Sequence, residues 1–448
     1  MTMPADPMEQ LKSRNYVMLL ALAAAIGVPV SVLAYFFLYF VSYLQKLIFV
    51  QLPVDVGFKG EPVWWPLPIL MVSGLLVASC IKYLPGTSGH SPADGFQFGG
   101  GAPSAAELPG VVLAALATLA LGVVLGPEAP LIAIGGGLGV IAVRLAKRDA
   151  PPATGVVMAA AGSFAAVSTL FGSPILGAFL LMEASGLGGP LMGLILVPGL
   201  LSAGIGFLIF DGLNAWTGLG AFSLAIPNLP TFSTPDVAEF GWALVIGLAA
   251  AVVGVAIHRL ALFLRGRVTP RMLILTPLVG AAIALVAMGF EGATGRGSST
   301  VLFSGQSALP SLVQHAAGWT AGALVLLVLC KAVAYGASLS SFRGGPVFPS
   351  LFIGAAGGMA LSHVGGLPLV PAVAMGIGAM CVAMLKLPLT SVLLGGLLVA
   401  KDAAAVMPLV IVAVTVAYVA SAWLTPSAKG VETVAAPAVA TPVAPAQG

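Results

Sequence analysis

One carboxylate interrupts a long apolar stretch of the chain. Glu128 lies in LGPEAPLIAIGGGLG (residues 125–139), directly after a Gly-Pro pair. Proline suits the start of a helix because the N–H group that it lacks is not needed there. The remaining N–H groups of the first turn attract an anion or a carboxylate. Because an acid inside a membrane segment costs about 2.5–3.5 kcal/mol and is functional by default, Glu128 is the first candidate for chemistry. A helix cap that only satisfies local amides is the structural alternative.

The same pattern recurs in the second part of the chain. GPEAPLIAIG (126–135) and GPVFPSLFIG (345–354) share a Gly-Pro pair, a second proline four places after the glycine, and a final Ile-Gly, at an offset of 219. FGSPILGAFLL (171–181) and LKLPLTSVLLG (385–395) form a second pair at an offset of 214. Two ordered matches predict two homologous halves of about 200 residues, a pattern typical of secondary transporters. Two helix starts, one from each half, can converge on one anion.

The composition excludes a soluble protein. Of the 448 residues only 7% are charged and 59% are hydrophobic, whereas an ordinary soluble domain carries about 25% charged residues. The net charge of +3 is spread thinly, which argues against a nucleic acid as partner. Three distant cysteines and four scattered histidines form no metal-ligand spacing, so no metal or other cofactor is expected. Nothing in this composition indicates an enzyme.

The apolar runs predict an all-α polytopic membrane protein. Several runs are too short for one span of about 20 residues, and others are long enough that they must bend or tilt. We expect an N-terminal segment at 1–16, a membrane domain at 17–425 with halves at about 17–211 and 240–425, and a disordered Pro/Ala-rich tail at 426–448. We expect a protein of the plasma (inner) membrane whose N-terminus lies in the cytoplasm. The positive-inside rule gives this orientation from three basic clusters: Lys12/Arg14, Arg144/Lys147/Arg148 and Arg259/Arg265/Arg267/Arg271.

A third break, LPGTSGHSPADG (84–95), precedes the other two. With all three in order, residues 80–425 resemble the CLC family of chloride channels and proton/chloride antiporters. LGPEAPLIAIGGGLG is similar to the GREGP motif of that family, and Gly345–Pro349 is similar to its GxFxP motif. Ser88-Gly89, with Gly95 at the proper distance, is similar to its GSGIP motif, although His90-Ser91 replace Ile-Pro.

The resemblance implies two inverted-topology repeats of tilted and half-length helices, and a homodimer in the bilayer with one pore per subunit. It makes Glu128 a gate that competes with chloride for a helix N-terminus and that moves away when it is protonated. It also implies a set of anion ligands: Ser88, Gly89, Gly126, Ala129, Val347 and Phe348. Glu183, in LLMEASG, becomes a candidate proton relay, with a purely structural role equally open. Chloride is favoured over fluoride because Ser88 stands where fluoride-type members carry asparagine.

Several departures from the family indicate a channel rather than a proton-coupled antiporter, which remains the alternative. Ala184 stands where antiporters carry a second glutamate. Pro127 replaces an arginine, and Pro346 has no N–H group for the central anion, which leaves Val347 and Phe348 as donors. The family carries an inner tyrosine in a last helix, beyond the apolar run that ends here near residue 424. No tyrosine follows Tyr418 in this sequence, so we expect the inner gate to be altered or missing.

Two further features, Arg343 and the sequence at residues 86–89, each have more than one interpretation. Arg343, just before Gly344-Gly345, either attracts anions to the entrance or extends to the membrane interface. Gly86-Thr87-Ser88-Gly89 also spells the GxSG sequence of intramembrane serine proteases, which pair that serine with a histidine on a later helix. That remote alternative leaves the internal repeat unexplained.

Overall fold

The computed structural model describes residues 11–96, 101–147, 149–186, 190–218, 229–232, 234–399 and 402–425. The predicted tail at 426–448 and residues 1–10 of the predicted N-terminal segment lie outside these ranges. The described residues form helices and connecting turns, without a β-strand. The α-helices are α2 (Arg14–Lys46), α3 (Leu52–Asp55), α4 (Pro66–Tyr83), α5 (Leu108–Leu119), α6 (Glu128–Ala146), α7 (Pro152–Phe171), α8 (Pro174–Ser185), α9 (Pro190–Thr217), α10 (Val237–Val268), α11 (Met272–Thr294), α12 (Leu309–Gln314), α13 (Ala321–Ser341), α14 (Val347–Ser362), α15 (Leu369–Leu385), α16 (Pro388–Leu398) and α17 (Ala403–Leu424).

Helices of two lengths make up this fold. Among the described residues, eight segments are long and apolar enough to cross a membrane, and α5, α8, α14, α15 and α16 are shorter apolar helices. A helix of fewer than about 17 residues does not span the hydrocarbon core, so α5, α8, α14 and α16 cover only part of its thickness. The predicted all-α polytopic membrane protein is confirmed.

The breaks predicted around Pro174 and Pro388 occur at corresponding places. α7 ends at Gly172 (φ 59°), whose left-handed backbone stops the helix, and Pro174 opens α8. α15 ends at Lys386 (φ 60°), and Pro388 opens α16. Glycine adopts this conformation without strain, whereas the second half uses a lysine. The same device therefore separates the same two helices in both halves.

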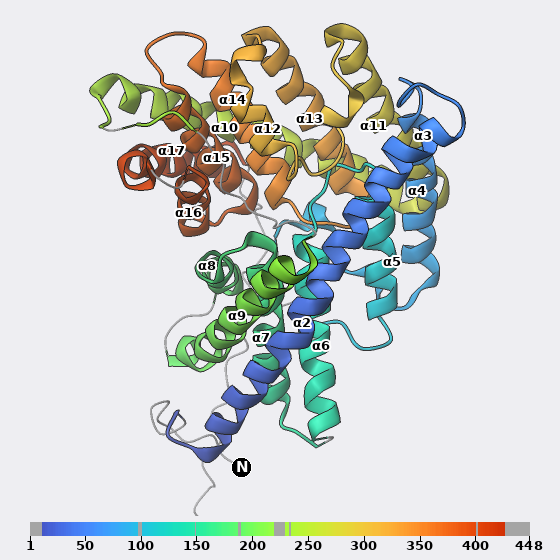
Figure 1. Ribbon diagram of the computed structural model, residues 1–448, viewed down its shortest axis with the longest axis vertical. Helices are drawn as coiled ribbons and strands as arrows, with labels where there is room; N and C mark the ends of the chain where they lie inside the picture. Colours follow the sequence, from blue (N-terminus) through green and yellow to red (C-terminus); the bar gives the residue numbers. More distant parts are fainter. Residues whose placement is uncertain are drawn as a thin grey trace, which may run out of the picture.

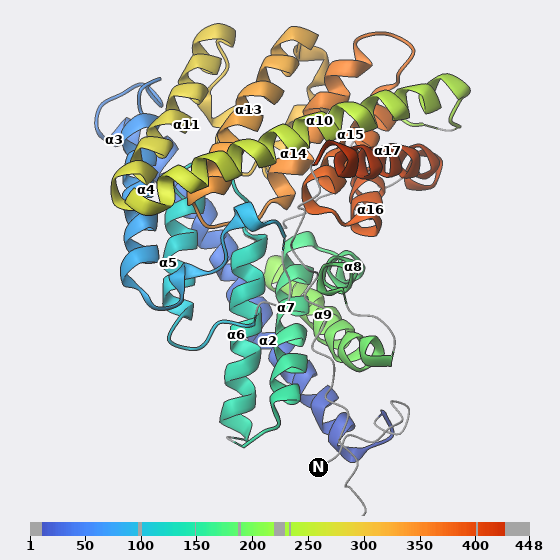
Figure 2. The ribbon, with the colours of Figure 1, turned by 180° about the vertical axis from the view of Figure 1, so that it is seen from behind.

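The packing inside each half is also repeated. A Cβ on Gly135 of α6 would lie 2.4 Å from the carbonyl oxygen of Gly162 on α7. A Cβ on Gly354 of α14 would lie 2.3 Å from the carbonyl oxygen of Gly376 on α15. Small residues allow helix backbones to touch in this way. Figure 1 shows α6–α9 grouped below and α14–α17 grouped above, and the view from behind in Figure 2 keeps this division. α6–α9 and α14–α17 thus form two corresponding groups, whereas α4 of the first half packs closely on α11 of the second, since a Cβ on Gly280 would lie 2.2 Å from the Leu70 carbonyl oxygen.

Candidate functional site

The two Gly-Pro motifs meet between the halves. Gly126 N–H donates to the Gly345 carbonyl at 2.8 Å, and Gly345 N–H donates to the Gly126 carbonyl at 2.6 Å. This bridge is antiparallel, as expected for two halves of opposite direction. The helices begin one residue later than the proline predicted to be their first, because Pro127 and Pro346 are N-caps of α6 and α14. Two helix N-termini therefore start from one short bridge.

Glu128 lies at the convergence of these two helix starts. Its side chain is 0% exposed, and Oε1 accepts a hydrogen bond from Phe348 N–H of α14 at 2.8 Å. The N–H groups of Val347 and of Glu128 itself also lie near the carboxylate. Oε2 has no hydrogen-bond partner among the described residues. The carboxylate of one half thus occupies first-turn amides of both halves, where positive helix ends favour negative charge.

Two glycines leave the space that this carboxylate fills. A Cβ on Gly126 would lie 2.2 Å from Oε2 and 2.4 Å from Oε1 of Glu128. A Cβ on Gly345 would lie 1.8 Å from Oε2. From the sequence, Gly126 was expected to bind an anion, but its N–H group is donated to Gly345 in this conformation. The motif alone gave no signal of the steric role that the structure gives to these two glycines.

Ser88 lies in a tight left-handed turn. Gly86 (φ 75°), Thr87 (φ 50°), Ser88 (φ 57°) and Gly89 (φ 91°) all have positive φ. The Ser88 side chain is 2% exposed, yet its Oγ has no hydrogen-bond partner among the described residues. A buried hydroxyl without a partner is costly, so it is suited to bind a ligand, and no described histidine activates it as a nucleophile. Gly89, expected beside it as an anion ligand, donates its N–H group back to Gly86 at 3.2 Å.

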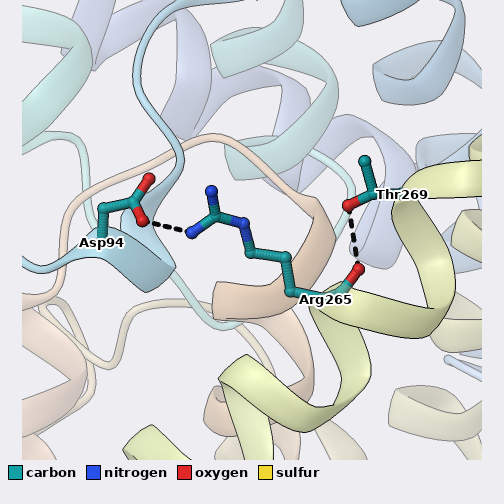
Figure 3. A network of polar contacts seen from close by, with 3 residues as sticks. All are labelled: Asp94, Arg265 and Thr269. Carbon is teal, nitrogen blue, oxygen red and sulfur yellow. Dashed lines mark hydrogen bonds and ion pairs between the residues drawn. The ribbon is translucent and has the colours of Figure 1, made fainter. Parts of the chain in front are cut away.

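A cavity of about 960 Å³ connects these elements. It is bordered by Ser88, by Ala129 directly after Glu128, and by Pro346 at the start of α14. It reaches the end of α10, where Arg265 forms an ion pair with Asp94 and Thr269 Oγ1 donates to the Arg265 carbonyl at 2.8 Å (Figure 3). The cavity therefore leads from the end of α10 to both helix starts.

Glu107 contributes a charge to the same cavity. Its carboxylate accepts a hydrogen bond from Ser104 N–H at 2.7 Å. This bond holds the pKa of the Glu107 carboxyl below its usual range, because hydrogen bonds to the ionised form favour it. Glu107 is therefore a permanent negative charge at neutral pH and a poor proton carrier.

Glu183 lies away from the two helix starts, on α8. Its Oε1 accepts from Leu389 N–H at 2.9 Å, and its Oε2 accepts from Thr390 N–H at 2.8 Å and from Thr390 Oγ1 at 2.7 Å. These donors belong to the first turn of α16, so the carboxylate joins the break in one half to the break in the other. The structure thus shows a helix cap, and the proton relay stays a prediction.

A polar stripe on α13, formed by Lys331, Tyr335 and Ser338, was not predicted from the sequence. Tyr335 is fully buried and donates its hydroxyl to the Pro346 carbonyl at 2.9 Å. One turn later, Ser338 Oγ accepts from Val124 N–H at 3.2 Å. The stripe therefore contacts the segments that precede both α6 and α14. The spacing of Lys331, Tyr335 and Ser338 at i, i+4 and i+7 was the available signal.

Lys331 is the third member of this stripe and is 0% exposed. Its ammonium donates to the carbonyls of residues 300, 301, 302 and 303 at 3.3, 2.9, 3.1 and 3.3 Å. It also lies 4.4 Å from the ring centroid of Phe352 on α14. The segment that it binds continues to the helix starts, because Phe303 N–H donates to the Gly122 carbonyl at 3.0 Å. The Lys331 side chain therefore points into the protein, where it holds the backbone of residues 300–303 in place, and does not reach the membrane interface.

Comparison with known proteins agrees with this architecture. A family model described as Voltage gated chloride channel matches residues 69–422. The ion-transport protein YfeO of Escherichia coli O7:K1 is 29% identical over 370 residues, covering 81% of this chain and 82% of its own. The protein of the same name from Shigella boydii serotype 4 is 30% identical over 370 residues, with the same coverage.

Solved structures share the fold. A slow cyanobacterial Cl⁻/H⁺ antiporter superposes with a TM-score of 0.72 at 20% identity, over 91% of this chain and 94% of its own. A CLC-type fluoride/proton antiporter superposes with a TM-score of 0.67 at 19% identity, over 90% of this chain and 95% of its own. Together with the family match across most of the chain, these likenesses show that the protein belongs to the CLC family of membrane transport proteins.

Proposed function

We propose that this protein exchanges chloride for protons across the membrane and that Glu128 is both the gate and the proton carrier. The observation that carries the proposal is the position of the Glu128 carboxylate, which accepts Phe348 N–H at 2.8 Å while buried between two helix starts. A chloride ion would need the same amides. Carboxylate and anion therefore exclude each other from one site.

Protonation of Glu128 would change this competition. Hydrogen bonds to a charged group contribute about 1.5–3 kcal/mol, against about 0.5–1.5 kcal/mol for neutral partners. A neutral carboxyl group is thus held less firmly by Phe348 N–H. When it leaves, an anion from the cavity takes the amides, with Ser88 and Ala129 on its path. When the anion leaves, the deprotonated carboxylate returns. Protons and anions move in opposite directions when the carboxyl group takes up its proton from one side of the membrane and releases it to the other side.

The comparisons support exchange better than the channel that the sequence favoured. Both solved structures described above are named as antiporters of an anion and protons. Ala184 removes the second glutamate of antiporters, but the cavity borders Ala129, the residue next to Glu128. Water that fills this cavity would carry protons to Glu128 without a glutamate at position 184 and without Glu183.

The test is a flux measurement on liposomes that contain the purified protein under a chloride gradient. A pH electrode records protons and a chloride electrode records chloride. We expect chloride flow to drive protons in the opposite sense, and Glu128→Gln to abolish proton movement while chloride flux continues. Glu239→Gln, a change at the capping box of α10, is the control and should keep the coupling. Chloride flux without proton movement in the parent protein would establish a channel instead.

The membrane orientation and assembly belong to the same proposal. The basic clusters of the sequence favour a cytoplasmic N-terminus and a cytoplasmic position for the part of the cavity at the end of α10. The likeness to the family implies a homodimer with one pathway per subunit. Cysteine accessibility at position 12 in intact cells tests the orientation, and light scattering of the detergent complex tests the dimer.

A further inference from the structure

The cavity contains a cation that the three sequence motifs do not explain. Arg343 directly precedes the Gly344-Gly345 pair and lines the cavity. Its Nε and Nη2 groups both donate to the Thr87 carbonyl at 3.3 Å, and its Nη1 group donates to the Phe342 carbonyl at 3.3 Å. A side chain of the second half thus binds, with two donors, the carbonyl that precedes Ser88 in the first half.

The turn that Arg343 binds is one that needs outside support. Thr87 and Ser88 are two consecutive non-glycine residues whose backbone φ angles are positive, at 50° and 57°. Such residues rarely adopt the left-handed region, and a strained pair persists only where the surrounding structure fixes it. On one side, Gly110 packs closely, since a Cβ there would lie 3.4 Å from Ser88 Oγ. On the other, the Arg343 guanidinium fixes the Thr87 peptide and so the direction of Ser88.

Arg343 also brings an unpaired charge. Among the described residues it forms no ion pair, because the only one found there joins Arg265 and Asp94. Those two residues act on Arg343 with opposite sign. A guanidinium has five N–H groups, of which the carbonyls of Thr87 and Phe342 take three. Two donors and one positive charge remain beside the cavity.

We infer that Arg343 is a positioning residue of the anion site to which the resemblance assigns Ser88, and that it supplies the positive charge of that site. Ser88 donates a buried hydroxyl that has no other partner. Arg343 attracts the anion and holds Ser88 in position. Arg343 thus supplies a positive charge in a chain whose first motif has Pro127 in place of arginine. The inference rests on the proposed anion transport and names a residue that sets its affinity.

Calorimetric titration of chloride into the purified protein tests this site. Arg343→Gln removes the charge, and chloride binding should weaken about tenfold. Arg343→Lys keeps the charge but loses the fork to Thr87, so it should retain most of the affinity and alter the chloride/nitrate ratio as Ser88→Ala does. Arg271→Gln, which removes an exposed charge outside the cavity lining, is the matched control and should bind chloride as the parent does. Equal affinities in the Arg343→Gln and Arg271→Gln proteins would overturn the inference.

A second measurement remains informative if Arg343→Gln fails to fold. In a protein with Cys80, Cys330 and Cys381 replaced, Arg343→Cys is reacted in liposomes with a cationic or an anionic methanethiosulfonate. The cationic reagent should raise chloride flux and the anionic reagent should lower it. The same effect from both reagents would contradict a role for charge. A parent protein without any anion flux would instead refute the proposed function, so the two failures are distinguishable.

Discussion

Gly126→Ala is the sharpest perturbation of the gate, because it acts on the carboxylate without altering it. The added Cβ would lie 2.2 and 2.4 Å from the two Glu128 oxygens, whereas a C···O contact needs about 3.3 Å. The three nearest atoms all belong to the flexible end of the Glu128 side chain, so the carboxylate must retreat by about 1 Å. The 2.8 Å bond to Phe348 N–H then stretches beyond hydrogen-bond length.

The expected effect follows from the lost bond. A charge-assisted hydrogen bond contributes about 1.5–3 kcal/mol, so the balance between a bound and a released carboxylate should shift about 10- to 100-fold towards release. In liposomes, Gly126→Ala should raise chloride flux at neutral pH and reduce its dependence on pH. Gly357→Ala in α14 is the control, since its Cβ meets nothing within 4 Å. Parent-like flux and pH dependence in a folded Gly126→Ala protein would refute the steric reasoning.

Four further predictions follow from individual side chains. Ser88→Ala should change the chloride/nitrate permeability ratio while thermal unfolding stays the same; an unchanged ratio would remove Ser88 from the site. Lys331→Met leaves four carbonyls without their ammonium donor and should cost about 3 kcal/mol of unfolding free energy, measured by denaturation in detergent; a parent-like midpoint would contradict this. Glu183→Gln should weaken the α16 cap by about 1 kcal/mol and keep proton coupling; lost coupling would make Glu183 the relay. Burial raises the pKa of Glu61 to about 7, with Ser298 Oγ lowering it and Glu291 raising it. The protonated Glu61 side chain therefore contributes fully to stability below about pH 4.5, and this contribution is lost as pH rises through about 7. Glu61→Gln should make the unfolding temperature less dependent on pH over that range. An unchanged pH profile would contradict the assignment.

The sequence predicted the parts of this fold that depend on local pattern. The Gly-Pro pairs at 126 and 345 mark helix starts in both halves, and the breaks at Pro174 and Pro388 fall where expected. Glu128 was found because a lone acid in an apolar run is conspicuous.

The rest depends on contacts between residues far apart in the chain. Phe348 N–H reaches Glu128 across 220 residues, and Arg343 reaches Thr87 across 256 residues. No spacing in a single sequence reports such pairs. For the same reason the sequence could not show that Gly126 donates its N–H group to Gly345, or that Glu183 receives three donors from α16.

The central claim is that the Glu128 carboxylate and an anion compete for the same backbone amides. Calorimetric chloride binding at neutral pH, compared between the parent and Glu128→Ala proteins, tests it most directly. Removal of the competing carboxylate should tighten chloride binding by about tenfold or more, because a charge-assisted bond no longer has to be broken. Equal or weaker binding by the folded Glu128→Ala protein would contradict the account.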